Sequence, residues 1–468
     1  MNDAFAFRRP IPILLSIFVG LCAATVALPH GTNLALLLTL SLILLAAVWW
    51  LLVSPSRWIA VFLFTALLLP PLPVELGNSG PHLGVAVAAF GVFIGIARLS
   101  EWRISFDPVS ASLLLFFAVL LASVGCAAAF SGLEIAAGSL VRVLLLGITV
   151  YIFFYSLHGP GSSAAGDSFA RFRPIYWIAV VSVLFACVDF YYQFPAPAGY
   201  GPQFVWLDSG VYRRAQGVFY EASTLGNLCA FFLVTIVVAM FRARDAVPLS
   251  RPALLFGAAV FTTALVFSYS RGSVVNVIAA LAALLYVRRV RIDLKRALVV
   301  VLSSLVAGAA IVYWVFPSFA EAYWIRLSNS VGFFAPATEG VLSGRVASWR
   351  ILGTFLFEHP WHLLLGVGYK TLPYSEYIGQ IATPDNMYLG LLVETGILGL
   401  GAVLILCAAI LRESLKAARS PDSRTSFFGT AIFCFWAGQM AQMLSGDLLT
   451  YWRVLPLYFW VLATALRR

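Results

Sequence analysis

Long apolar runs separated by short polar breaks make up most of this chain. The runs fall at 11–28, 33–53, 58–73, 83–98, 109–130, 135–157, 175–194, 222–242, 254–269, 273–287, 297–316, 387–411, 427–444 and 454–466. A helix needs about 20 mostly apolar residues to cross a bilayer, and the runs at 58–73, 273–287 and 454–466 are shorter. The pattern therefore predicts an all-α polytopic membrane protein with 12–14 transmembrane helices, built as a single membrane domain over residues 1–468.

Composition and charge agree with this fold class and orient it. The chain is 61% hydrophobic and 11% charged, with a mean hydropathy of +0.93, which excludes an ordinary soluble domain. With the N-terminus placed in the cytoplasm, 21 of the 30 Lys and Arg residues fall in cytoplasmic segments, eight fall outside, and Arg142 lies in a span. This bias follows the positive-inside rule and predicts that both termini are cytoplasmic. The basic balance is an orientation signal and gives no reason to expect a nucleic-acid partner.

Two long segments interrupt the apolar pattern, and both are predicted to lie outside the cytoplasm. The first, 195–221, is rich in Pro, Gly and aromatic residues. The second, 317–386, is the larger and is the only long stretch without a membrane-length apolar run. Connections this long are uncommon and often functional. Within the larger loop, Glu339–Leu356 has the spacing of an amphipathic helix, and Gly366–Tyr369 is typical of a turn.

No pattern of metal or cofactor binding is visible in the sequence. The six cysteines all fall in apolar runs, as small core residues do. The five histidines lack ligand spacing with cysteines or paired carboxylates. A phosphate-binding loop and a dinucleotide fingerprint are also missing. We therefore expect neither a cofactor nor a metal.

The basic residues predicted outside the cytoplasm run against the orientation bias. They are Arg213, Arg214, Arg271, Arg326, Arg345, Arg350, Lys370 and Arg453. Arginine binds phosphate bidentately and stays charged in a low dielectric, so a cluster would suit a diphosphate anchored to a lipid. Ion pairs with nearby acids or lipid head groups are an equal alternative for any one of them. Arg271 is the sharpest candidate, because it stands between two spans, where an unpaired charge is costly.

Three carboxylates accompany these arginines in the sequence. Asp385 precedes the span at 387–411, where it could accept a proton from a hydroxyl or cap the helix, and both interpretations remain open. Glu221 could orient an arginine or act as a second acid or base, with a simple ion pair as the alternative. Glu394 lies inside the span and needs a partner there.

Four stretches resemble the O-antigen ligase and Wzy-like polysaccharide polymerase superfamily of bacterial inner-membrane glycosyltransferases. They are Arg214 to Glu221, the Ser270-Arg271-Gly272 turn, Ser343-Gly344-Arg345 with Trp349 and Gly366 to Tyr369, and Asp385-Asn386 with Glu394 to Gly399. The resemblance covers roughly residues 210–410, and the N-terminal half shares only its hydrophobicity. It implies a multi-pass protein of the bacterial inner membrane.

The resemblance also implies a substrate and a site. The family transfers glycan from undecaprenyl-diphosphate-linked oligosaccharide at the periplasmic face, which here implies diphosphate binding by Arg214, Arg271 and Arg345. Family ligases typically have histidine immediately before the residue that matches Asn386, whereas this chain has Asp385. The chain therefore looks more like a polymerase than like a lipid A-core ligase.

Taken together, these residues predict an inverting, metal-independent glycosyltransferase. Asp385 would orient or deprotonate a hydroxyl of the acceptor, which is a glycan, a lipid A-core or another molecule, while Arg271 and Arg345 stabilise the departing diphosphate. The supporting candidates are Glu221, Asn386, Trp349 and Tyr369. The two aromatic side chains among them, Trp349 and Tyr369, could stack on sugar rings.

A transporter or flippase of lipid-linked glycans is the rival hypothesis. It predicts charged residues along a path across the bilayer and discontinuous helices. A structural assembly factor is a third possibility, and it predicts that single outside arginines can be replaced without loss of glycan product.

Overall fold

The structure is a computed structural model that describes residues 57–72, 80–160, 165–197, 200–207, 210–242, 247–287 and 345–467, together with Thr39, Trp50, Ala310, Tyr313, Trp314, Pro317, Glu321 and Trp324. The chain divides into two compact units, Met1–Trp58 and Ile59–Arg468, and the candidate site lies in the second. The helices expected at 11–28, 33–53 and 297–316, and the loop residues 325–344, lie outside the continuously described ranges. They stay predictions.

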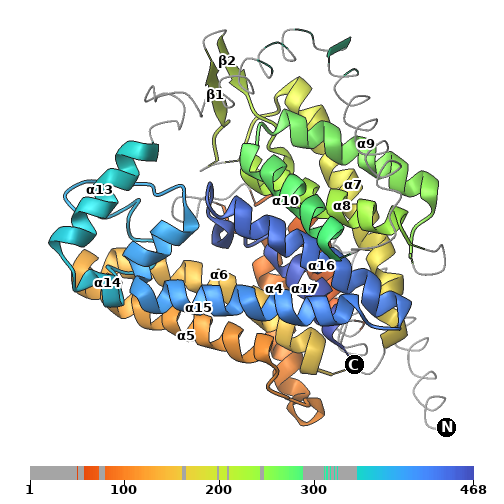
Figure 1. Cartoon of the computed structure of the whole chain (residues 1–468), viewed down its shortest axis with the longest axis horizontal. Helices are drawn as coiled ribbons and strands as arrows, with labels where there is room; N and C mark the ends of the chain where they lie inside the picture. The colour runs from red at the N-terminus through yellow and green to blue at the C-terminus, as the bar shows by residue number, and fades with distance from the viewer. Residues whose placement is uncertain are drawn as a thin grey trace, which may run out of the picture. The chain divides into compact units, whose positions relative to one another are not determined.

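The described residues form helices and one small hairpin (Figure 1). Five helices are long and apolar enough to cross a membrane: α5 (Pro108–Ser131), α6 (Leu133–His158), α7 (Ala165–Tyr192), α8 (Ala222–Met240) and α15 (Met387–Ala418). The other α-helices are α3 (Arg57–Leu68), α4 (Leu83–Ala97), α9 (Arg251–Phe267), α10 (Arg271–Val287), α13 (Arg345–Glu358), α14 (His362–Leu365), α16 (Ser423–Gln442) and α17 (Leu455–Leu466). The predicted all-α polytopic fold class is confirmed, and the total of 12–14 spans stays a prediction.

Polar caps and a glycine turn set several helix ends. At the start of α5, the Asp107 carboxylate accepts the backbone N–H groups of Val109 and Ser110, and Pro108 occupies the first helical position. Gly132, with a φ of +89°, joins α5 to α6. The two helices are therefore antiparallel neighbours and pack side by side.

One end of the helical unit is held together by basic residues that the sequence places in the cytoplasm. The guanidinium of Arg242, just after α8, donates to the hydroxyls of Ser426 and Thr430 at the start of α16, at 2.9 and 2.8 Å. Arg467, just after α17, donates to the carbonyl of Ser156 at the end of α6. We call this the inner end.

The opposite ends of the helices carry segments that the sequence places outside. The N–H of Ala215 donates to the carbonyl of Phe267 at the end of α9, at 2.9 Å. The N–H of Met387, the first residue of α15, donates to the carbonyl of Met443 just after α16, also at 2.9 Å. We call this the outer end, and residues 200–221, 268–271, 345–386 and 443–454 gather there.

A break at Gly396 divides α15. Gly396 has a non-helical φ of +67° and ψ of −168°, which separates Met387–Thr395 from the rest of the helix. The break lies inside the apolar run 387–411, and the part of the helix that follows it ends in a turn that carries Arg412, Glu413 and Lys416. Gly396 therefore divides the predicted span itself, in its outer half.

The large loop docks against this break. The carbonyls of Val393 and Glu394 accept the N–H groups of Val367 and Gly368, at 3.0 and 2.8 Å. Gly366 and Gly368 have φ values of +73° and +116°, and a Cβ on Gly366 would lie 2.3 Å from the Glu394 carbonyl. The predicted turn at Gly366–Tyr369 is confirmed, and the close backbone approach explains why glycine occupies it.

A two-stranded hairpin lies in the first long loop, where sequence analysis predicted no strand. Strands β1 (Phe204–Leu207) and β2 (Gly210–Arg213) pair antiparallel, with Phe204 opposite Arg213. The pairing continues one step beyond the strands, because the N–H of Arg214 donates to the carbonyl of Gln203 at 2.8 Å. The hairpin thereby fixes the backbone of a predicted diphosphate ligand.

Candidate functional site

Arg214 lies where the hairpin meets the end of α9. Its Nε donates to the carbonyl of Ser268 at 2.9 Å. Burial lowers the pKa of the Arg214 guanidinium, the Glu221 carboxylate opposes this, and the positive charges of Arg271 and Arg345 lower the pKa further. The three arginines predicted to bind diphosphate, which come from three separate parts of the sequence, therefore lie close enough to interact electrostatically.

Arg271 is the first residue of α10, and a tight turn presents it. Tyr269 adopts a φ of +50° just before it, and the hydroxyls of Ser270 and Ser273 lie 2.8 Å apart. A Cβ on Gly272 would lie 2.8 Å from the Ser445 hydroxyl, so the turn packs closely against the segment after α16. The small residues around Arg271 are therefore required by packing.

Arg345 and Asp385 form an ion pair at the outer end. The Arg345 Nε lies 3.3 Å from Asp385 Oδ2, and the two side chains are 26% and 52% exposed. One turn further along α13, the Trp349 indole N–H donates to the carbonyl of Pro384 at 2.6 Å. These two bonds attach α13 to the residues just before α15.

Asn386, not Asp385, caps α15. The Asn386 Oδ1 accepts the N–H of Leu389 at 3.1 Å. Asp385 has a φ of +43°, and its carboxylate is directed to Arg345. Of the two interpretations that the sequence left open, the helix cap is therefore excluded for Asp385 in this structure.

Glu221 lies at the start of α8, seven residues after Arg214. The Thr224 hydroxyl donates to Glu221 Oε2 at 2.6 Å. Burial raises the pKa of the Glu221 carboxyl, whereas the Thr224 bond and the charges of Arg214 and Lys370 lower it. The structure thus places a second carboxylate within electrostatic range of the arginines.

Lys370 joins this group, although sequence analysis assigned it no role in the site. Its ammonium forms an ion pair with Asp447, in the segment after α16. Burial lowers the pKa of Lys370, and the carboxylates of Glu394 and Glu221 raise it. Glu394 in turn receives backbone hydrogen bonds from Lys370 and Leu372, which gives the acidic residue of α15 the partners that its position requires.

Tyr369 lies beneath the site and not at its surface. Its side chain is 1% exposed, and its carbonyl accepts the Ser139 hydroxyl at 2.6 Å. The covered ring offers no face to a sugar, so the stacking role considered for Tyr369 does not fit this structure. Trp349 is partly exposed and keeps that possibility.

The comparison with known families agrees with this geometry. Residues 253–404 match the family model described as O-Antigen ligase. The chain carries an O-antigen ligase domain. The superfamily resemblance seen in the sequence is thereby confirmed, and it supports a membrane enzyme of ligase or polymerase type, a class whose substrates are a lipid-linked glycan and an acceptor. No curated protein matches the chain.

The O-antigen ligase match and the spatial site overlap without coinciding. Arg271, Arg345 and Asp385 lie inside the matched range, whereas Arg214 and Glu221 precede it. The electrostatic contact of Arg214 with Arg271 and Arg345 joins the two parts. The candidate site of this O-antigen ligase domain therefore extends to the hairpin.

A buried amide network supports the ligase domain below Arg271. The Asn227 side-chain NH₂ donates to Gln439 and Gln442, at 3.0 and 2.9 Å, and Asn276 also donates to Gln442, at 2.9 Å. The Tyr458 hydroxyl donates to Asn227 at 2.7 Å. Amide side chains inside apolar runs indicate interhelical hydrogen bonds of this kind. These amides are visible in the sequence, and the network could have been predicted from them.

The described residues show no metal-binding group. Across the described ranges from 57 to 467, no three His, Cys, Asp or Glu side chains gather as a metal ion would require.

Proposed function

We propose that this protein is a glycosyltransferase of the bacterial inner membrane that extends a glycan at the periplasmic face, using an undecaprenyl-diphosphate-linked donor. The observation that carries the proposal is the convergence of Arg214, Arg271 and Arg345 at the outer end of the helices. The positive charges of Arg271 and Arg345 both act on Arg214, and a diphosphate would accept hydrogen bonds from guanidinium groups of this kind. The site is thus preorganised for an anion with more than one charge.

The proposed reaction is a single displacement. The oxygen of an acceptor hydroxyl attacks the anomeric carbon of the donor sugar, and the bond from that carbon to the diphosphate oxygen breaks. Asp385 takes the hydroxyl proton, and the arginines stabilise the charge that develops on the departing lipid diphosphate. One displacement inverts the anomeric configuration, so the product linkage is opposite in configuration to the donor linkage.

Asp385 favours a polymerase over a lipid A-core ligase. The carboxylate stands where ligases of the superfamily typically have histidine, and the structure leaves it available because Asn386 caps the helix. The acceptor proposed here is accordingly a second glycan.

The break in α15 bears on the rival flippase hypothesis. Transporters place discontinuous helices and their substrate sites near the middle of the bilayer. Here the break at Gly396 lies in the outer half of the apolar run 387–411, and the site residues lie at one end of the helices. This arrangement favours catalysis at one face over passage between faces.

The proposal is tested by glycan transfer in membranes with a defined lipid-linked donor. Asp385→Asn, Arg271→Ala and Arg345→Ala should each reduce transfer by about 100-fold or more. Arg412→Ala, an exposed change at the inner end of α15, is the matched control and should leave transfer intact. Normal transfer by all three well-expressed site variants would overturn the assignment. Movement of donor between leaflets without a new glycosidic bond would favour the flippase.

A further inference from the structure

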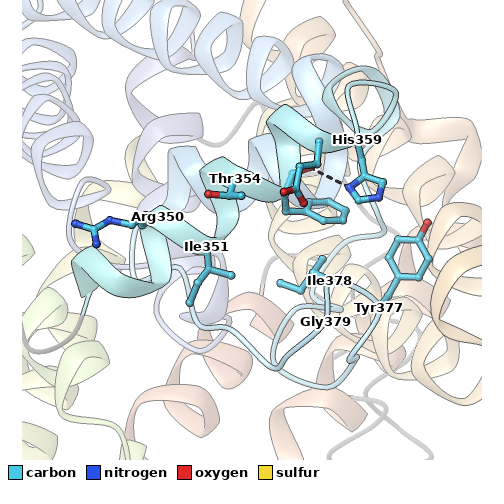
Figure 2. Close-up of a pocket in the computed structure, with 9 residues that line it drawn as sticks. Arg350, Ile351, Thr354, His359, Tyr377, Ile378 and Gly379 are labelled. Carbon is cyan, nitrogen blue, oxygen red and sulfur yellow. Dashed lines mark hydrogen bonds between the residues drawn. The ribbon is translucent and has the colours of Figure 1, made fainter.

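An open hollow runs along α13, separate from the arginine site. It has a volume of about 480 Å³ and lies between α13 and the segment 377–379. Figure 2 shows Arg350 at one end and His359 and Tyr377 at the other, with Thr354 and Ile378 between them. None of the arginines and carboxylates of the candidate site lines it.

The far wall of the hollow is fixed by packing. The Tyr377 hydroxyl lies 3.1 Å from Nε2 of the buried His362. The ring centroid of Tyr377 lies 5.2 Å from that of Phe130, at the end of α5. Phe355 belongs to a buried cluster with Leu352, so the floor is fixed as well. The hollow therefore exists before any ligand binds, as ligand sites usually do.

The lining combines two kinds of surface. Tyr377, Phe355 and Ile378 supply ring faces and apolar carbon, whereas Arg350 and Glu358 supply exposed charged groups. Within the described part of the chain, these two charged groups bond to no other residue. The polar groups are thus available to a ligand that also has an apolar face.

This combination excludes two simple occupants. A lipid chain would desolvate the charges of Arg350 and Glu358 without replacing their hydrogen bonds. A free phosphate would meet the Glu358 carboxylate as well as the arginine, and like charges repel. A sugar has apolar C–H faces and a rim of hydroxyls that both donate and accept, so it satisfies both kinds of surface.

The position of the hollow relative to the arginine site suits a chain molecule. Arg345, Arg350 and Thr354 all lie on α13. Arg350 and Thr354 therefore lie roughly 8 and 14 Å along the helix axis from Arg345. A glycan with one sugar at Asp385 would need only a few more units to reach the hollow.

We propose that the hollow beside α13 is a saccharide-binding subsite that holds the acceptor glycan a few sugars away from its reacting end. The inference rests on the proposed function for the identity of the glycan, and on the geometry for the class of ligand. The subsite would retain the growing chain between transfers and so lengthen the product.

The test uses the full chain in detergent micelles and a soluble probe. The probe is the oligosaccharide released from the cell's lipid-linked donor by mild acid, which lacks both lipid and phosphate. Isothermal calorimetry should show binding to the wild type. Tyr377→Ala and Glu358→Gln should each weaken it, by roughly three- to tenfold for the loss of the ring. Glu358→Gln alters only an exposed group and cannot disturb the core.

Trp361→Ala is the matched control. Its side chain is 84% exposed, lies close by in the sequence, and does not line the hollow. It should bind the probe as the wild type does. The subsite proposal would be overturned if the wild type did not bind the probe. It would also be overturned if Tyr377→Ala and Glu358→Gln both bound the probe as tightly as the wild type does.

Probe binding and glycan transfer test the subsite and the catalytic proposal separately. In the transfer assay, Glu358→Gln should shorten the product chains. Asp385→Asn should bind the probe normally and fail to transfer. If Asp385→Asn transfers normally yet the Tyr377 and Glu358 variants bind the probe weakly, the catalytic proposal fails and the subsite stands.

Discussion

The Nε of Arg345 lies 3.3 Å from Oδ2 of Asp385, which joins the first residue of α13 to the residue before the cap of α15. Both side chains are partly open to solvent, so the pair contributes little to folding. Its interest is chemical. The group proposed to accept a proton and a group proposed to bind the leaving diphosphate hold each other in place before substrate arrives.

Arg345 and Asp385 should therefore behave as one catalytic unit. Arg345→Ala and Asp385→Asn should each lower kcat/KM for glycan transfer by about 100-fold or more, and the double variant should lose far less than the product of the two factors. Asn is the suitable replacement, because it tolerates the left-handed φ of +43° at this position. Strictly multiplicative losses would mean that the two side chains act independently.

Replacing Asn386 should affect stability first. Asn386→Ala removes the side-chain bond to the N–H of Leu389 and should lower the free energy of unfolding by about 1 kcal/mol. Asn386→Asp keeps an acceptor at the helix start and should restore it. Thermal unfolding in detergent measures both. Asp385→Asn, which tolerates the left-handed φ of +43°, serves as the comparison, and an equal loss of stability there would contradict the assignment of the cap to Asn386.

The docking of the large loop on α15 should depend on glycine. Gly366→Ala places a Cβ 2.3 Å from the Glu394 carbonyl at a φ of +73°, so it should lower the melting temperature and the transfer rate together. Gly401→Ala, on α15 itself, is the control. A Cβ there meets nothing within 4 Å, so this change should be neutral or stabilise the helix by about 0.5–1 kcal/mol. Equal effects at the two positions would contradict the docking.

Glu221 should make stability depend on pH. Burial raises the pKa of its carboxyl above the ordinary value of 4.5, so the folded state binds the proton more tightly than the unfolded state does. The stability that this group contributes is present below pH 4.5 and is lost as pH rises through the folded pKa. The melting temperature of Glu221→Gln minus that of the wild type should therefore increase as the pH is raised from 4 to 8.

Glu376→Gln, an exposed change at the same end of the molecule, controls for the loss of one carboxylate. If its melting temperature relative to the wild type changes with pH as much as that of Glu221→Gln, the effect comes from the loss of any carboxylate and not from the burial of Glu221. A pH-independent difference for Glu221→Gln would show that the carboxyl is not perturbed by burial.

The sequence predicted the class of fold, which is confirmed, and a site that stays a prediction. Apolar runs indicate membrane helices directly, whereas the arginines on the side of the membrane poor in positive charge were selected because nothing in the orientation signal explains them. The grouping of Arg214, Arg271 and Arg345 was expected because all three are predicted on the same side of the membrane and because of the superfamily resemblance. The structure adds that they are within electrostatic range.

Other features depend on contacts that no local pattern encodes. Each strand of the hairpin has only four paired residues. An alternation of apolar and polar residues over so short a stretch cannot be distinguished from a loop in the sequence. Tyr369 lies in a polar loop, yet it is buried because Gly366 and Gly368 bring the loop against α15 and α5. Lys370 pairs with Asp447, 77 residues away, and such a pairing is set by helix packing.

The contacts of the outer part of α15 have a consequence for how the protein is made. Its first N–H bonds to Met443, and Lys370 nearby bonds to Asp447, so both rely on residues that follow α16. The docking carbonyls of Val393 and Glu394 are likewise presented only once α15 has formed. During synthesis, the hairpin and α13 are therefore produced well before the surfaces that position them. In a chain that is only partly inserted in the membrane, the arginines are present but the contacts that bring them together are not. We expect such a chain to be inactive until its last helices are inserted.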